Sequence, residues 1–320
     1  MSSALLIVAG LAGLLIGADL LVRGGAALAS HVGVRPIVIG LTVVSLGTSL
    51  PELAVGIDAV RQGSPGLTVG NIVGTNLVNI LFILGLSALI RPIAFERRTL
   101  RFDLPAMTGA CLALWLLALD GSLSWLDGTI LCLGGAAYTA GIAWTSRQES
   151  ASVRADYASR SERTTVRGGR GFLLRGLTVF AGLGLLLVGA EFLVDGSIEV
   201  ARSLEVSEAI IGLTVIAIGT SAPELVTTLT STLRGDRDIA VGNLLGSTVY
   251  NVALVLGITV LAAAADLQIP REVIAADLLI LAVVALITVP VLLSGHRISR
   301  LEGGAFVAAY VGYLVWLTLV

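Results

Sequence analysis

The sequence of 320 residues contains no lysine, and charged residues of all kinds make up only 13% of it. Soluble domains carry about 25% charged residues, so the charges here are too few to coat water-exposed domains. Hydrophobic residues reach 56%, and the mean hydropathy is +0.95. The composition therefore excludes a water-soluble protein and indicates an integral membrane protein that contacts lipid.

The chain also lacks the usual signs of a disulfide framework, a nucleic-acid partner or an enzyme. Its two cysteines, Cys111 and Cys132, lie in apolar runs without metal-ligand spacing. The 22 acidic residues nearly balance the 20 arginines, which gives no basic surface for nucleic acid. No HExxH, GxSxG or phosphate-binding loop occurs. We therefore expect neither catalysis nor a cofactor.

Apolar runs long enough to cross a membrane are abundant. A spanning helix needs about 20 mostly apolar residues. Ten such runs lie near residues 4–22, 36–60, 66–90, 104–120, 125–145, 171–195, 207–233, 239–264, 272–293 and 302–320. The sequence thus predicts an all-α integral membrane protein with ten transmembrane helices.

An arginine-rich, serine-rich segment divides the chain at residues 146–170. We interpret it as a flexible cytoplasmic linker between a first repeat, 1–145, and a second, 171–320. With the linker inside, 17 arginines fall on the cytoplasmic side and 3 outside, which is a strong positive-inside bias. The pattern predicts a multi-pass protein of the cell (inner) membrane with both termini outside.

The two halves repeat one another at an offset of 172 residues. GLTVVSLGTSLPEL at 40–53 aligns with GLTVIAIGTSAPEL at 212–225, and residues 40–86 contain 18 identities in 47 pairs. Each half is predicted to hold five helices, an odd number, so the second half must enter the membrane from the opposite face. Inverted repeats are typical of secondary transporters, whose substrate sites lie near the membrane midplane.

A glutamate lies deep inside one predicted helix of each repeat. Glu52 is about 16 residues into an apolar stretch, and Glu224 occupies the same place in the second copy. An ionised carboxylate at that depth costs a few kcal/mol on insertion scales. Two symmetry-equivalent carboxylates therefore predict a shared cation site.

Each glutamate ends a GTSxPE motif. Its proline, Pro51 or Pro223, frees carbonyl oxygens about one turn earlier. Carbonyls, hydroxyls and carboxylates are hard oxygen ligands that suit calcium and also sodium. The spacing of Ser49 to Glu52 also matches a capping box, a purely local alternative that a broken helix would accommodate.

A second motif follows in each half, GNxxGTxxxN at 70–79 and GNxxGSxxxN at 242–251. Thr75 and Asn79 are four residues apart and share one helix face, as do Ser247 and Asn251. We expect these faces to bind or support the cation. Asp19 has Arg23 four residues later, which predicts a local ion pair.

These paired motifs resemble the two alpha-repeats of the cation/calcium antiporter superfamily, and the chain looks like a prokaryotic sodium/calcium exchanger along its whole length. The resemblance implies calcium and sodium as transported ions, four clustered cation sites, and alternating access by sliding of the first and sixth helices. We expect the protein to be a monomer. The implied ligands are Ser45 and Ala217 through backbone oxygens, with Thr48, Ser49, Glu52, Thr75, Asn79, Thr220, Ser221, Glu224, Ser247 and Asn251. Asparagine at both 79 and 251, where some members have aspartate, disfavours potassium cotransport.

Two alternatives share these residues. A calcium/proton antiporter of the same fold could use the glutamates as proton carriers, because burial can raise the pKa of a carboxyl group. A cation channel could use the same oxygens as a selectivity site, and saturable counter-transport would distinguish an antiporter from it. A purely structural membrane scaffold would not account for two buried carboxylates.

Overall fold

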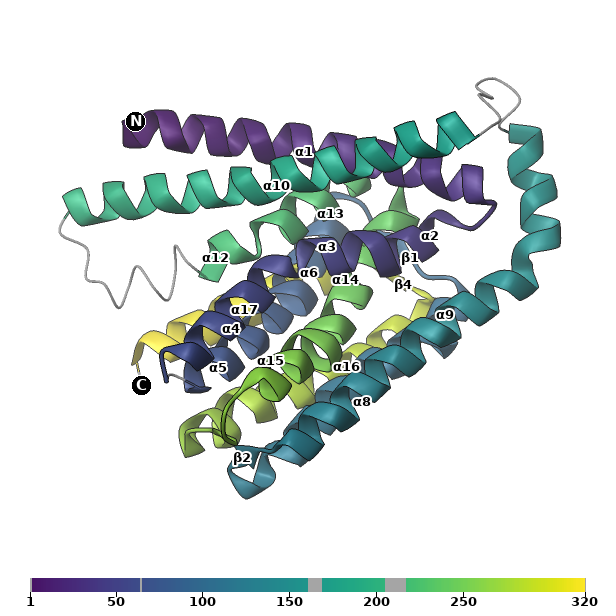
Figure 1. Cartoon of the computed structure of the whole chain (residues 1–320). Helices are drawn as coiled ribbons and strands as arrows, with labels where there is room; N and C mark the ends of the chain where they lie inside the picture. Colours follow the sequence, from purple (N-terminus) through teal and green to yellow (C-terminus); the bar gives the residue numbers. More distant parts are fainter. Residues whose placement is uncertain (1, 64, 161–168, 205–216, 320) are drawn as a thin grey trace. The chain divides into compact units, whose positions relative to one another are not determined.

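A computed structural model describes residues 2–63, 65–160, 169–204 and 217–319, and its long elements are all helices (Figure 1). They form two compact units, Met1–Thr48 with Gly141–Asn243 (unit 1) and Ser49–Ala140 with Leu244–Val320 (unit 2). Each unit takes residues from both halves of the sequence. The division into two repeats and a linker therefore follows the sequence rather than these units, and it stays a prediction.

Unit 1 contains two long helices and the broken helices that precede the two glutamates. Its elements are α1 (Ser3–Val32), α2 (Pro36–Ile39), the π-helix η1 (Gly40–Val44), α3 (Ser45–Thr48), the end of α9 (Trp125–Arg160), α10 (Gly169–Ser203), α12 (Ala217–Thr220), α13 (Ala222–Arg234) and the start of α14 (Arg237–Tyr250).

Helices α1 and α10 lie side by side and antiparallel, in backbone contact at glycines (Figure 1). A Cβ on Gly17 would lie 2.7 Å from the carbonyl oxygen of Gly182, and a Cβ on Gly10 would lie 2.8 Å from that of Gly189. Such contacts are too close for any side chain, so glycine at these positions allows the two helices to pack tightly.

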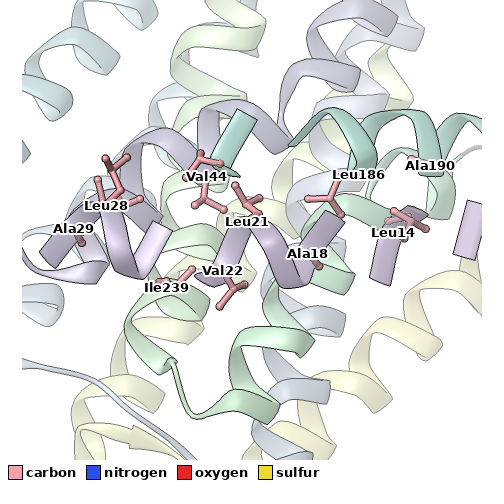
Figure 2. Packing of buried hydrophobic residues seen from close by; sticks show 13 residues of the cluster. Leu14, Ala18, Leu21, Val22, Leu28, Ala29, Val44, Leu186, Ala190 and Ile239 are labelled. Atoms are coloured by element: carbon pink, nitrogen blue, oxygen red, sulfur yellow. The ribbon is translucent and has the colours of Figure 1, made fainter. Parts of the chain in front are cut away.

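Small and branched apolar side chains extend this contact toward other helices of unit 1. Leu14, Ala18 and Leu21 of α1 pack with Leu186 and Ala190 of α10 in one buried cluster (Figure 2). The cluster also includes Val44 of η1, Ala222 of α13 and Ile239 of α14. Because lipid is as apolar as these side chains, their close fit rather than water exclusion stabilises the contact.

An ion pair also connects α1 to α13. The predicted pair forms, with Arg23 Nε 2.9 Å from Asp19 Oδ2, and Arg234 at the end of α13 contacts the other carboxylate oxygen. The sequence did not indicate the second arginine.

Arg234 also acts on a carboxyl group in the turn after α13. Burial raises the pKa of Asp236 there, and the positive charge of Arg234 opposes that rise.

Unit 2 contains the remaining helices and two pairs of very short strands. Its elements are α4 (Leu50–Arg61), α5 (Pro65–Leu77), the π-helix η2 (Val78–Ile83), α6 (Leu84–Ile90), β1 (Ile93–Ala94), α7 (Arg97–Arg101), α8 (Asp103–Leu117), the 3-10 helix η3 (Ala118–Asp120), β2 (Ser122–Leu123), the start of α9, the end of α14, the π-helix η5 (Asn251–Leu256), α15 (Gly257–Ala262), β3 (Leu267–Gln268), the π-helix η6 (Val273–Leu278), α16 (Leu279–Gly295), β4 (Arg297–Ile298) and α17 (Arg300–Leu319).

The short strands pair across the two halves of the sequence. Strand β1 pairs antiparallel with β4, and β2 pairs antiparallel with β3. In each half one strand follows the third predicted helix and the other precedes the fifth. Each pairing thus joins the strand after the third helix of one half to the strand before the fifth helix of the other half.

Eight helical segments within the described ranges are long and apolar enough to cross a membrane. They match eight of the ten predicted spans; the span 302–320 corresponds to α17, and the span 207–233 begins outside the described residues and continues as α12 and α13. Residues 146–160, expected in a flexible linker, instead extend α9 to Arg160. The expectation of a flexible segment was wrong there, because arginine, alanine and glutamate are good helix formers even where the apolar run has ended.

Candidate functional site

The helix that leads to each glutamate is interrupted at the serine of its GTSxPE motif. Ser49 has φ −83° and ψ 5°, and Ser221 has φ −84° and ψ 2°, so α4 and α13 each begin anew at the following residue. Neither serine makes a side-chain capping hydrogen bond. The capping-box alternative is therefore wrong, because neither serine side chain caps the helix that follows it.

The Glu52 carboxylate is a fully buried ionisable group of unit 2. Glu52 is 0% exposed, in the first turn of α4. Neither of its oxygens has a hydrogen-bond partner among the described residues, and the Ser49 hydroxyl three residues earlier also has none. A buried carboxylate without compensation is costly, so this arrangement fits a group that receives a cation.

Amide groups of the second motif lie on helices packed against α4. Helix α4 contacts both α5 and η5, and Asn79 and Asn251 lie in the π-helices η2 and η5. Both polar atoms of Asn79 and the Oδ1 of Asn251 are buried and have no partner among the described residues. Asn251 Nδ2 donates to Asn76 Oδ1 at 3.4 Å. π-Helices often mark functional sites, and here they contain two of the predicted ligands.

The remaining predicted residues of unit 2 are buried as well. Thr75 in α5 is 3% exposed, and Ser247 in α14 is 0% exposed. Together with Ser49, Glu52 and the asparagines, they give this unit six of the twelve implied ligands.

Unit 1 gathers the other polar residues around Asn243. The Thr48 hydroxyl donates to Asn243 Oδ1 at 3.2 Å, and Asn243 Nδ2 donates to Thr228 Oγ1 at 3.1 Å. The Ser45 hydroxyl approaches the Gly40 carbonyl at 2.7 Å and the carbonyls of Gly242 and Asn243 at 3.1 Å each. Ser45 is thus held by backbone carbonyls through its side chain, which leaves a ligand role to its backbone oxygen.

Helix α13 presents a buried polar face that begins at Glu224. Glu224, Thr227, Thr228, Ser231 and Thr232 are each at most 4% exposed. They recur at intervals of three and four residues, so they follow one face of the helix. Burying polar side chains inside a membrane protein costs free energy, so a buried polar face indicates a functional surface.

Helix α10 contacts both GTSxPE motifs within unit 1. A Cβ on Gly47 would lie 2.7 Å from Leu183, and one on Gly219 would collide with the side chain of Val194. The glycine of each motif therefore permits close approach of α10 to the two helix breaks.

The remaining predicted ligands lie at the second helix break. Thr220 is half-buried, and Ser221 is 1% exposed with no partner for its hydroxyl among the described residues. Only the backbone of Ala217 is described.

Comparisons with known proteins show the family of the chain. The chain matches the family described as sodium/calcium exchanger protein over residues 2–144 and 176–319. The chain belongs to this family. It is 34% identical over 319 residues to the inner membrane protein YrbG of Escherichia coli, covering 100% of this chain and 96% of that protein.

Two proteins named as sodium/calcium exchangers are also similar along nearly their whole length. The sodium/calcium exchanger MaX1 of Methanosarcina acetivorans is 29% identical over 347 residues, covering 98% of this chain and 97% of that protein. A solved structure of the sodium-calcium exchanger NCX_Mj superimposes with a TM-score of 0.83 at 29% identity, covering 98% of each chain. The resemblance to cation/calcium antiporters is confirmed, and so are a multi-pass helical membrane protein and a role in cation/calcium exchange.

This member of the sodium/calcium exchanger family also holds polar residues that the sequence did not single out as functional. Asn243 and Asn76 make the amide contacts described above, and Thr228 meets Asn243. Asn243 was visible in the GNxxGS motif, but nothing in the spacing showed that its side chain turns toward α13. Thr228 has no counterpart in the first repeat, where the equivalent residue is Gly56, so symmetry could not reveal it.

Proposed function

We propose that this protein is a secondary active antiporter that exchanges sodium for calcium across the membrane by alternating access. The Glu52 carboxylate supports this most directly, because it is 0% exposed and has no hydrogen-bond partner among the described residues. Such a charge needs a cation, and the nearby hydroxyl and amide oxygens are hard ligands suited to calcium and sodium.

The charge of the proposed site accounts for exchange rather than simple binding. Glu52 and Glu224 together supply two negative charges, which balance one calcium ion or two sodium ions. Calcium and sodium therefore compete for the site. Either load neutralises the two carboxylates, so the loaded site can change from one side of the membrane to the other. The empty site keeps two charges in a low-dielectric interior and resists crossing. This difference couples the two ion fluxes.

The proposed ligands are those of the two motifs in each half. They are the backbone oxygens of Ser45 and Ala217 and the side chains of Thr48, Ser49, Glu52, Thr75, Asn79, Thr220, Ser221, Glu224, Ser247 and Asn251. We place this site near the membrane midplane, where inverted repeats of transporters meet.

Alternating access would then involve α1 and α10. These helices contact one another through backbone at glycines, and α10 also meets Gly47 and Gly219 beside the two helix breaks. A shift of the α1–α10 pair would therefore reach both motifs. We further propose ten transmembrane helices in two inverted repeats, with both termini outside and residues 146–170 in the cytoplasm. A monomer contains all the residues of this proposal.

A calcium/proton antiporter is the second candidate, and the same carboxylate favours it. A proton on Glu52 would also remove the cost of a buried charge. The hydroxyl and amide oxygens gathered with it mildly favour sodium, because a proton carrier needs only the carboxyl group.

The experiment is calcium uptake into proteoliposomes loaded with sodium and diluted into sodium-free buffer. We expect uptake that requires internal sodium and is unchanged when potassium is omitted from both sides. A parallel arm imposes only a proton gradient. Uptake driven by protons alone would keep the glutamates but overturn the coupling ion, and potassium-dependent uptake would overturn the expectation from Asn79 and Asn251.

A further inference from the structure

The side chain of Asn243 connects three elements of unit 1. It is 0% exposed and lies in α14. Its Oδ1 accepts from Thr48 of α3 at 3.2 Å, and its Nδ2 donates to Thr228 of α13 at 3.1 Å and to the Glu224 carbonyl at 3.5 Å. One amide thus bridges a proposed ligand of the first repeat and the helix turn that carries the glutamate of the second.

The orientation of this amide follows from its partners. The Glu224 carbonyl can only accept a hydrogen bond, so the NH₂ group of Asn243 must face α13. Its Oδ1 then faces Thr48, whose hydroxyl proton is directed to Oδ1 or to the Ser45 carbonyl at 3.3 Å. With its proton directed in this way, the Thr48 hydroxyl turns its lone pairs, the part of the group that binds a cation, away from Asn243 and Ser45.

The first repeat lacks this arrangement. The offset of 172 aligns Asn243 with Asn71 and Thr228 with Gly56, which has no hydroxyl. Asn71 Nδ2 is buried and has no partner among the described residues. A Cβ on Gly56 would lie 2.9 Å from Thr259 Oγ1, so α4 has no room for the missing threonine. The contact is therefore specific to the second repeat.

We propose that Asn243 and Thr228 are positioning residues that set the calcium affinity of the site. Asn243 aligns the Thr48 hydroxyl so that its oxygen faces the ion, and Thr228 holds the Asn243 amide in the orientation that this requires. Neither residue is itself a ligand. The inference rests on the proposed function, because it assumes that Thr48 contributes to the cation site.

The test compares two substitutions one turn apart on α13. Thr228→Val removes the hydroxyl that Asn243 contacts while keeping the side-chain shape. Thr232→Val is the matched control, because Thr232 is also buried but its hydroxyl donates to the Thr228 carbonyl of its own helix, at 2.8 Å, and has no other partner among the described residues. Thr228→Ser restores the hydroxyl and serves as the rescue.

Calcium binding to purified protein is measured at equilibrium, with thermal unfolding in calcium-free buffer as the second readout. The net contribution of one hydrogen bond is modest, so we expect Thr228→Val to weaken calcium binding about 3–10-fold. Thr232→Val should stay within about twofold of the unchanged protein, Thr228→Ser should recover binding, and the two valine variants should unfold at similar temperatures, as expected for removal of one hydroxyl each.

Equal calcium affinities of the two valine variants would overturn the proposal, as would a loss of affinity that only follows a loss of stability. The binding assay also separates this proposal from the proposed function. Protein that binds calcium but does not exchange it for sodium would overturn sodium/calcium antiport, while the comparison of Thr228 with Thr232 would still decide the positioning role.

Discussion

Glu52→Gln is expected to lower sodium-driven calcium uptake at least ~100-fold, which corresponds to about 2.7 kcal/mol. The substitution removes one of the two charges that balance calcium, while the glutamine keeps the shape of the side chain. The carboxylate is buried and has no partner among the described residues, so no protein contact is broken. We therefore expect the protein in cation-free buffer to unfold at the same temperature or a higher one. Uptake in proteoliposomes and thermal unfolding in detergent provide the two measurements.

Asp58→Asn is the matched control for this substitution. Asp58 lies on the same helix, α4, but is exposed, and it accepts a hydrogen bond from Gln62 at 2.5 Å. It should keep uptake within about twofold, because solvent-exposed pairs contribute little. Glu224→Gln should behave like Glu52→Gln. Normal uptake after either glutamine substitution would contradict the proposed charge balance.

Gly189→Ala is expected to disrupt the pairing of α1 and α10 and to abolish exchange. The added Cβ would lie 2.7 Å from the Leu14 nitrogen and 2.9 Å from the Gly10 carbonyl oxygen. Both are backbone atoms that cannot turn away, so the helices must separate. Overpacking of this kind costs about 1–3 kcal/mol. Thermal unfolding and uptake are measured together.

Gly184→Ala separates this steric effect from the effect of alanine on the helix. Gly184 lies on the same helix, and a Cβ there would meet no atom within 4 Å. Alanine favours a helix over glycine by about 1 kcal/mol, so this variant should be at least as stable as the unchanged protein. If Gly189→Ala were as stable and active as Gly184→Ala, close backbone packing of α1 on α10 would not be needed.

The helical membrane character and the buried polar motifs could be predicted from the sequence, because the motifs occur in it twice. A repeated GTSxPE motif within apolar runs predicts a buried carboxylate, and Glu52 and Glu224 are both 0% exposed. The proline at the second position of α4 and of α13 likewise predicts the observed breaks at Ser49 and Ser221. Local chemistry determines these features, so spacing along the chain reveals them.

Features that depend on packing between distant segments could not be predicted in this way. The apolar run of the first helix ends near residue 22, yet α1 continues to Val32, and its Gly24 still packs against Val179 of α10. The π-helices around Asn79 and Asn251 add one residue to a turn without any local sequence signal. The contact of Asn243 with Thr48 and the ion pair of Asp19 with Arg234 join residues more than 190 positions apart.

Competition between sodium and calcium for one site tests the central claim most directly. Calcium bound to the purified protein is measured at fixed calcium while sodium is raised, at constant pH and ionic strength. We predict complete displacement with a dependence on about two sodium ions per calcium, and little calcium binding after Glu52→Gln. Calcium that stays bound at saturating sodium, but is released by acid, would contradict sodium/calcium exchange at this carboxylate pair.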